Sequence, residues 1–191
     1  MNRKQTALVV FILLIAAVFA GCKQQQQSQW SQGKAGQNQV VAPPAMVKSP
    51  AEIQQLEAIA KANAGNANAW IALGNAQMDA QRFAEAIISY QRALDLDPKN
   101  VDVRVDMGTC YRNLGMPDRA VTLYEKALSL EPAHQNALLN LGIVYGYDRK
   151  EYGRAIAYWE QLLQVSPKHP KADYLQATMA QFKKTMRQRA N

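Results

Sequence analysis

The feature that most constrains the fold is an internal repeat. When the sequence is offset by 34 residues, similar side chains fall into register in three consecutive units, 67–100, 101–134 and 135–169. The aligned sets are Trp70, Arg104 and Leu138; Leu73, Met107 and Leu141; Gly74, Gly108 and Gly142; Gln77, Tyr111 and Tyr145; Ala86 and Ala120; and Tyr90 and Tyr124. A repeat of this length indicates that each unit is one supersecondary element stacked on the next.

Within each unit the spacing predicts two helices. In the first unit Trp70, Leu73 and Gly74 lie three or four residues apart, so they share one helical face. A second apolar stripe follows from residue 83 and ends before Pro98, because proline cannot continue a helix. We expect Gly74 to face Ala86 where the two helices cross. The third unit carries one extra residue, which we place in its inter-helix turn, around residues 147–153.

Both ends of the array need a covering element. Residues 51–66 have apolar side chains at helical spacing and are predicted to form the second helix of an incomplete unit. Residues 170–191 place Leu175, Met179, Phe182 and Met186 on one stripe, with basic residues on the other faces. This stripe predicts a capping helix, with a basic amphipathic membrane helix as the alternative. The predicted fold class is therefore all-α, a helix-turn-helix solenoid.

The repeat skeleton resembles the tetratricopeptide repeat (TPR) family, whose pattern is W-x2-L-G-x2-Y, then A-x3-F, A and P. The resemblance covers residues 67–168. Residues 56–77, LEAIAKANAGNANAWIALGNAQ, with the three units after them, are also similar to the periplasmic TPR modules of cytochrome c maturation factors, which hold apocytochrome segments. They resemble more distantly the TPR pilotin lipoproteins of type IV pilus assembly, which usually carry more repeats.

The TPR resemblance implies a concave groove lined by the first helix of each unit. The groove positions carried over to this sequence are Asn68, Ile71, Asn75, Met78 and Asp79 in the first unit; Asp102, Val105, Asp106, Thr109, Arg112 and Asn113 in the second; and Asn136, Leu139, Asn140, Ile143, Gly146 and Tyr147 in the third. Asn and Asp side chains can hydrogen-bond an extended peptide backbone, and the acids favour a basic peptide. Ile71 and Asp106 replace the Lys and Asn of chaperone-binding TPRs, so that carboxylate clamp is absent.

The N-terminal 21 residues read as a secretory signal. Residues 7–21 are an apolar run of 15, which would reach only about 22 Å of a roughly 30 Å bilayer core. The run ends at Ala20-Gly21-Cys22, which resembles the lipobox of bacterial lipoproteins and implies acylation of Cys22. Phe19 stands where the box usually has Leu, which leaves ordinary cleavage or an uncleaved anchor open. Lys23 weakly favours the outer over the inner membrane.

Residues 22–50 follow as a Gln-rich segment with no helical or strand periodicity, predicted to be a disordered tether. The formal charge of +7 divides into +4 for residues 1–65 (six basic, two acidic), −1 for 66–169 (eleven, twelve) and +4 for 170–191 (five, one). The repeats are therefore near neutral, and nucleic-acid binding is not expected.

The sequence contains no recognisable catalytic constellation. HExxH, CxxC, GxSxG and phosphate-loop motifs do not occur in it, and its two Cys and two His residues rule out dense disulfide or His-rich metal chemistry. Cys110 aligns with Ala76 and Val144, so we interpret it as a small apolar residue. We expect no enzyme activity, no cofactor and no metal.

Three hypotheses for function follow. The first is a lipid-anchored, periplasm-facing TPR adaptor in the bacterial cell envelope that binds a protein or peptide, with a membrane contact through its lipid. The second is an assembly factor for cytochrome c maturation or, with less support, for type IV pili. The third is a membrane-surface protein that uses its basic terminal helix. The oligomeric state is open.

Overall fold

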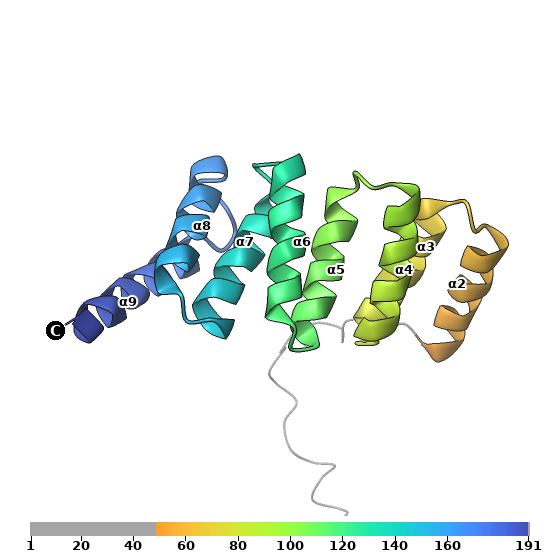
Figure 1. The fold of residues 1–191 in the computed structure, drawn as a ribbon, viewed down its shortest axis with the longest axis horizontal. Helices are drawn as coiled ribbons and strands as arrows, with labels where there is room; N and C mark the ends of the chain where they lie inside the picture. Colours follow the sequence, from red (N-terminus) through yellow and green to blue (C-terminus); the bar gives the residue numbers. More distant parts are fainter. Residues whose placement is uncertain (1–48, 191) are drawn as a thin grey trace, which may run out of the picture. The chain divides into compact units, whose positions relative to one another are not determined.

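A computed structural model describes residues 49–190, and all of the regular structure in this range is helical (Figure 1). The predicted signal, Cys22 and the tether up to residue 48 lie outside the described residues. The helices in chain order are α2 (Pro50–Ala62), α3 (Ala67–Asp79), α4 (Phe83–Leu96), α5 (Val101–Asn113), α6 (Pro117–Leu130), α7 (Gln135–Ile143), the π-helix η1 (Val144–Asp148), α8 (Tyr152–Val165) and α9 (Ala172–Ala190).

The helices form three hairpins: α3 with α4, α5 with α6, and α7–η1 with α8 (Figure 1). A three-residue turn joins the two helices of each hairpin. Each turn contains one residue with a left-handed backbone, Gln81 (φ 59°), Gly115 (φ 74°) and Lys150 (φ 58°). The turns are therefore equivalent in all three hairpins, although only the middle one uses glycine for this conformation.

Polar side chains cap the first helix of every hairpin. Asn66, Asn100 and His134, again spaced by 34 residues, accept hydrogen bonds from backbone N–H groups in the first turns of α3, α5 and α7. At α2, Ser49 and Glu52 form a capping box, and Pro50 is the first helical residue. Pro50 is therefore the first residue of α2 and Ser49 its N-cap, whereas both were predicted to lie in the tether. The helix ends at Ala62 before its cap Asn63, short of the predicted residue 66.

Each hairpin is closed by an aromatic side chain that lies over a glycine of the partner helix. An ideal Cβ on Gly74 would lie 2.6 Å from Cε1 of Tyr90, and one on Gly108 would lie 2.6 Å from Cε1 of Tyr124. In the third hairpin a Cβ on Gly142 would lie 2.0 Å from Nε1 of Trp159. The nearest neighbour of Gly74 is thus Tyr90, and not Ala86 as expected from the sequence, because the ring itself fills the helix crossing.

The extra residue of the third unit lies within the first helix of the hairpin, and not in the turn as predicted. Helices α3 and α5 have 13 residues each, whereas α7 and η1 together have 14, and the turns are equal in length. The backbone absorbs the insertion as one π-helical stretch, in which the N–H of Arg149 donates to the carbonyl of Val144 five residues earlier. Side chains after residue 144 are consequently rotated relative to their equivalents in α3 and α5.

Helix α9 caps the array. Leu175, Met179 and Phe182 of its apolar stripe are buried, whereas Met186 is 42% exposed. Phe182 packs on Gly146 of the π-helix, where an ideal Cβ would lie 2.7 Å from its ring. Most of the apolar face of α9 is therefore packed against the array, and this leaves little of it to contact a membrane surface, as the alternative prediction for this helix requires. Among residues 49–190, no helix combines the length and the hydropathy needed to cross a bilayer.

The glycine–aromatic contact gives a first prediction. Gly108→Ala forces a methyl group against the buried Tyr124 ring, so the free energy of unfolding should fall by about 1–3 kcal/mol in chemical denaturation. Gly65→Ala is the control, because nothing lies within 4 Å of its Cβ position, and it should change stability by less than about 0.5 kcal/mol. Equal denaturation midpoints for the two variants would contradict this packing.

The left-handed turn residues give a second prediction. Gln81→Gly and Lys150→Gly should each stabilise the fold by up to about 1 kcal/mol, because glycine has no steric penalty at positive φ. Gly115→Ala, at the equivalent turn, should destabilise it by a similar amount. In thermal melts the two substitutions to Gly should raise the melting temperature, and Gly115→Ala should lower it. A change in the same direction for all three variants would show that the three turns are not equivalent.

Candidate functional site

The polar atoms of the three buried aromatic anchors bond to groups of α3, α5 and α7, and we call the side of the array formed by these helices the first-helix face. The Tyr90 hydroxyl donates to Oδ1 of Asn75 (2.8 Å), and the Tyr124 hydroxyl lies 3.2 Å from Oγ1 of Thr109. In the third hairpin the partner position is Ile143, so Nε1 of Trp159 donates instead to the backbone carbonyl of Leu139 (3.1 Å). The face therefore changes from polar to apolar along the array.

The polar part of the face is a network of amide and hydroxyl groups. The Asn113 amide donates to the carbonyl of Thr109 (2.9 Å), and the Asn140 amide donates to the Thr109 hydroxyl (3.4 Å). This second bond joins α5 to α7. Asn75 and Asn113 remain exposed, so their amides can also contact the backbone of an extended ligand.

Acidic side chains lie beside this network. Oδ1 of Asp102 is 2.9 Å from Nε2 of His134, whose Nδ1 caps α7 by accepting from the N–H of Ala137. Burial, reinforced by the nearby Asp102 and Asp79, raises the pKa of Asp106 to about 6, although His134 opposes the rise. Burial is the main cause of this rise, and the neighbouring carboxylates of Asp79 and Asp102 add negative charge to the same part of the face.

Arg112 does not balance these acids. Its Nε and Nη2 atoms donate to the two carboxylate oxygens of Asp148, at 2.6 and 3.1 Å, in a bidentate pair that raises the pKa of Arg112. Asp148 is the last residue of the π-helix, so the insertion brings this partner to Arg112. The predicted groove cation is thus neutralised within the protein.

An aromatic cleft lies at the C-terminal end of the first-helix face, and we call it the repeat-3 cleft. Its volume is about 390 Å³. It is lined by Leu139, Ile143, Tyr147, Trp159, Lys171, Tyr174 and Leu175. The hydroxyls of Tyr147 and Tyr174 are 2.8 Å apart, and the Tyr147 ring packs edge-on against Phe182 with centroids 5.8 Å apart. The walls are therefore held by contacts between the π-helix and α9.

Most of the predicted groove residues are accessible in the structure. The exposed ones are Asn68, Asn75, Asp79, Asp102, Asn113, Asn136 and Tyr147, and the half-buried ones are Ile71, Met78, Asp106, Thr109, Arg112, Asn140 and Ile143. Two predictions are wrong. Val105 is 3% exposed and belongs to the core, and Gly146 is buried under Phe182 because the π-helix turns it away from the groove. Leu139 is 8% exposed but still lines the cleft.

Sequence reasoning missed four cleft residues: Trp159, Lys171, Tyr174 and Leu175. The apolar spacing assigns Leu175 to the capping stripe, and it gives no sign that its neighbour Tyr174 lines a cleft. A signal was available in the extra residue of the third unit, because an insertion within a helix redirects every side chain that follows it.

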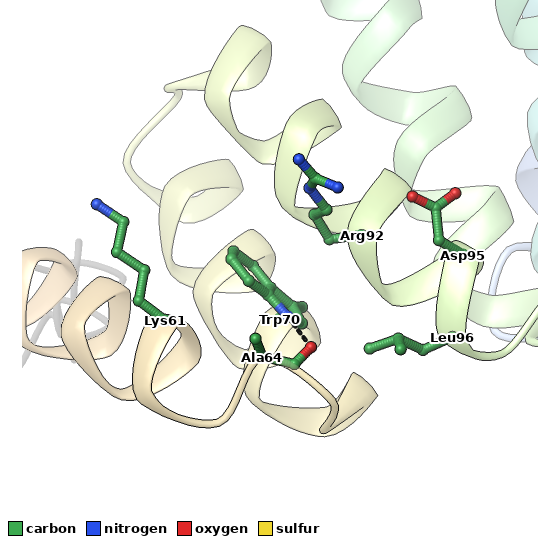
Figure 2. A pocket seen from close by; sticks show the side chains of 6 residues that line it. All are labelled: Lys61, Ala64, Trp70, Arg92, Asp95 and Leu96. Carbon is green, nitrogen blue, oxygen red and sulfur yellow. Dashed lines mark hydrogen bonds between the residues drawn. The ribbon is translucent and has the colours of Figure 1, made fainter.

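A second hollow, of about 350 Å³, lies between α2 and α4. Figure 2 shows Trp70 there, with Lys61 and Arg92 on either side of it. The Trp70 indole donates to the carbonyl of Ala64 (3.0 Å), and the Lys61 ammonium pairs with Glu57 (2.7 Å). Because these groups already have partners, we interpret this hollow as the joint between the incomplete unit and the first hairpin.

The described residues hold no cluster of three or more His, Cys, Asp or Glu side chains suited to a metal. Cys110 is fully buried, and burial raises the pKa of its thiol to about 12, so it stays protonated at neutral pH. It therefore packs as an apolar side chain.

The high pKa of Asp106 gives a pH prediction. The folded state binds this proton more tightly than the unfolded state does, so Asp106 lowers stability as the pH rises from about 4 to about 6. Asp106→Asn should be more stable than the parent above pH 6, by about 1 kcal/mol after solvent screening, and equal to it below pH 4. Urea unfolding at several pH values measures this, with Asp173→Asn as an exposed control. A constant difference between Asp106→Asn and the parent at all pH values would contradict the assignment.

The chain is similar in sequence to curated proteins. Two curated relatives, the cytochrome c-type biogenesis proteins CcmH of Escherichia coli (strain K12) and of Shigella flexneri, are each 24% identical to this chain over 182 residues. The alignment covers 86% of this chain and 52% of each relative, so the chain spans about half the length of the curated relatives it matches.

Two solved structures share the fold. The crystal structure of MamA has a TM-score of 0.58 and 27% identity, with 63% of this chain and 70% of that chain covered. The crystal structure of YrrB, described as a TPR protein with an unusual peptide-binding site, has a TM-score of 0.60 over 66% of this chain and 64% of that chain. Its identity is 23%, so it supports the fold alone.

The sequence model of one family spans most of the chain. The model of the cytochrome c-type biogenesis protein H TPR domain matches residues 23–173. Together with the helical hairpins and their structural relatives, this match confirms the predicted all-α TPR solenoid and the resemblance to cytochrome c maturation factors. The chain belongs to the family of cytochrome c-type biogenesis protein H TPR domains.

Proposed function

We propose that this protein is a scaffold that binds an extended segment of a partner protein along its first-helix face. The observation that carries the proposal is the change in that face, from exposed amides near α3 and α5 to the aromatic repeat-3 cleft. Amides can hydrogen-bond a peptide backbone of any sequence, whereas a cleft selects side chains. The acids Asp79 and Asp106 favour basic residues in the part of the segment opposite α3 and α5.

We further propose that the partner is a polypeptide undergoing cytochrome c assembly. The family match supports this role, and apocytochrome segments are the partner class that the TPR resemblance implies. The relatives named CcmH are about twice the length of the matched region, so any activity of their remaining part is not assigned to this chain.

We also propose that the protein is anchored in the cell envelope by a lipid on Cys22 and faces the periplasm. The support is the apolar run at residues 7–21 followed by Ala-Gly-Cys. Intact mass spectrometry of protein purified from membranes should give a chain that starts at Cys22 and carries diacylglyceryl. A mature chain that begins elsewhere, or that retains Met1, would contradict the anchor without affecting the groove.

Site-specific crosslinking tests the scaffold proposal. A photoreactive amino acid at exposed Asn113, on the first-helix face, should capture a discrete partner in the producing cells, and mass spectrometry should identify it as a c-type apocytochrome. The same amino acid at Ile88, which is 63% exposed on the second helix α4, is the matched control. Identical adducts from both positions, or none from Asn113, would contradict binding along this face.

A further inference from the structure

The repeat-3 cleft differs chemically from the rest of the first-helix face. Three aromatic side chains line it, contributed by the π-helix (Tyr147), α8 (Trp159) and α9 (Tyr174). The rings of Tyr147 and Trp159 are tilted by 53° with centroids 6.4 Å apart, a separation at which aromatic rings attract one another. Trp159 is fully buried, but Tyr147 and Tyr174 are 37% and 57% exposed, so the walls are accessible from solvent.

The size of the cleft limits its occupant. A volume of about 390 Å³ lies at the low end of the roughly 300–1,000 Å³ range of small-ligand pockets. This accommodates one large side chain together with the backbone next to it. Lys171 is the only charged side chain in the lining, and the polar groups of Tyr147, Tyr174 and Trp159 already have hydrogen-bond partners.

The charge of the cleft is opposite to that of the acidic part of the face. Lys171 is exposed, and none of the ion pairs within residues 49–190 involves it. The acids Asp79 and Asp106 lie towards α3 and α5, and the Arg112–Asp148 pair between the two regions is neutral. A ligand whose charges complement both ends of the first-helix face is therefore basic where it lies against α3 and α5 and acidic where it enters the repeat-3 cleft.

We propose that the repeat-3 cleft binds an aromatic side chain of the partner segment that lies next to an acidic residue, whose carboxylate pairs with Lys171. This inference rests on the proposed function and deepens it, because it names the two neighbouring side chains of the segment that the cleft recognises. Tyr147 and Tyr174 hold the ring, and Lys171 selects the residue next to it. The acidic residues at the other end of the face hold the basic part of the segment.

Three nine-residue Gly/Ser peptides, acetylated and amidated, test the proposal. They carry 4-fluorophenylalanine-Glu, 4-fluorophenylalanine-Lys or Ala-Glu at the centre. Fluorine NMR titrations with the purified full-length protein measure the first two, and competition measures the third. The Glu peptide should bind about threefold more tightly than the Lys peptide, as expected for an exposed ion pair. The Ala-Glu peptide should bind about tenfold more weakly, because it lacks the ring.

Protein variants locate the site. Tyr174→Ser should weaken both fluorinated peptides by about tenfold, whereas Lys171→Gln should remove only the preference for Glu. Lys168→Gln is the matched control for charge, because Lys168 is exposed in the preceding turn and does not line the cleft. Circular dichroism melts verify that each variant folds, and Tyr174→Phe, which keeps the ring, should retain affinity.

Two outcomes would overturn the assignment: equal affinities for the Glu and Lys peptides, or peptide binding that Tyr174→Ser leaves unchanged. Either result would stand apart from the crosslinking experiment. A partner captured at Asn113 with no aromatic preference at the cleft would preserve the scaffold proposal and refute this one. If no partner is captured at Asn113 while the cleft still prefers the aromatic-Glu peptide, the scaffold proposal is refuted and the specificity of the cleft stands.

Discussion

The packing of an aromatic ring on a glycine is the contact on which the array depends. Tyr90, Tyr124 and Trp159 are fully buried, and each occupies the place where a Cβ atom of the facing residue would stand. One side chain per hairpin thus sets the distance between its helices and also sends a polar atom towards the first-helix face. Packing and surface chemistry are therefore linked, since the same ring that closes the hairpin orients Asn75 or Thr109.

The third hairpin departs from this pattern by one residue, and the departure has three local consequences. Gly146 turns inward and receives Phe182 of the capping helix. Tyr147 turns towards Tyr174 and forms a wall of the cleft. Asp148 reaches Arg112 and neutralises it. A single π-helical stretch thus couples the cap, the cleft and the charge of the groove, which fits the frequent occurrence of such stretches at functional sites.

The helical hairpins of the three units could be predicted from the sequence, because a 34-residue period determines the number of helices, their pairing and their caps together. The period placed Tyr90 and Tyr124 at equivalent positions of second helices, as the structure has them. It failed where the period itself breaks. An alignment assigns an insertion to a turn by default, whereas the backbone here keeps all three turns alike and places the extra residue in the helix. The cleft depends on that choice and on the docking of α9, so Tyr174 and Lys171 could not be found by counting residues.

A crystal structure of the variant that lacks Val144 tests the central claim, that the inserted residue builds the cleft. Without it the third unit has 34 residues, like the first two. The account predicts a continuous α-helix from Gln135 to the turn, with Tyr147 rotated away from Tyr174 and Phe182 displaced from Gly146. A π-helix that re-forms elsewhere, or an unchanged contact between Tyr147 and Tyr174, would contradict it.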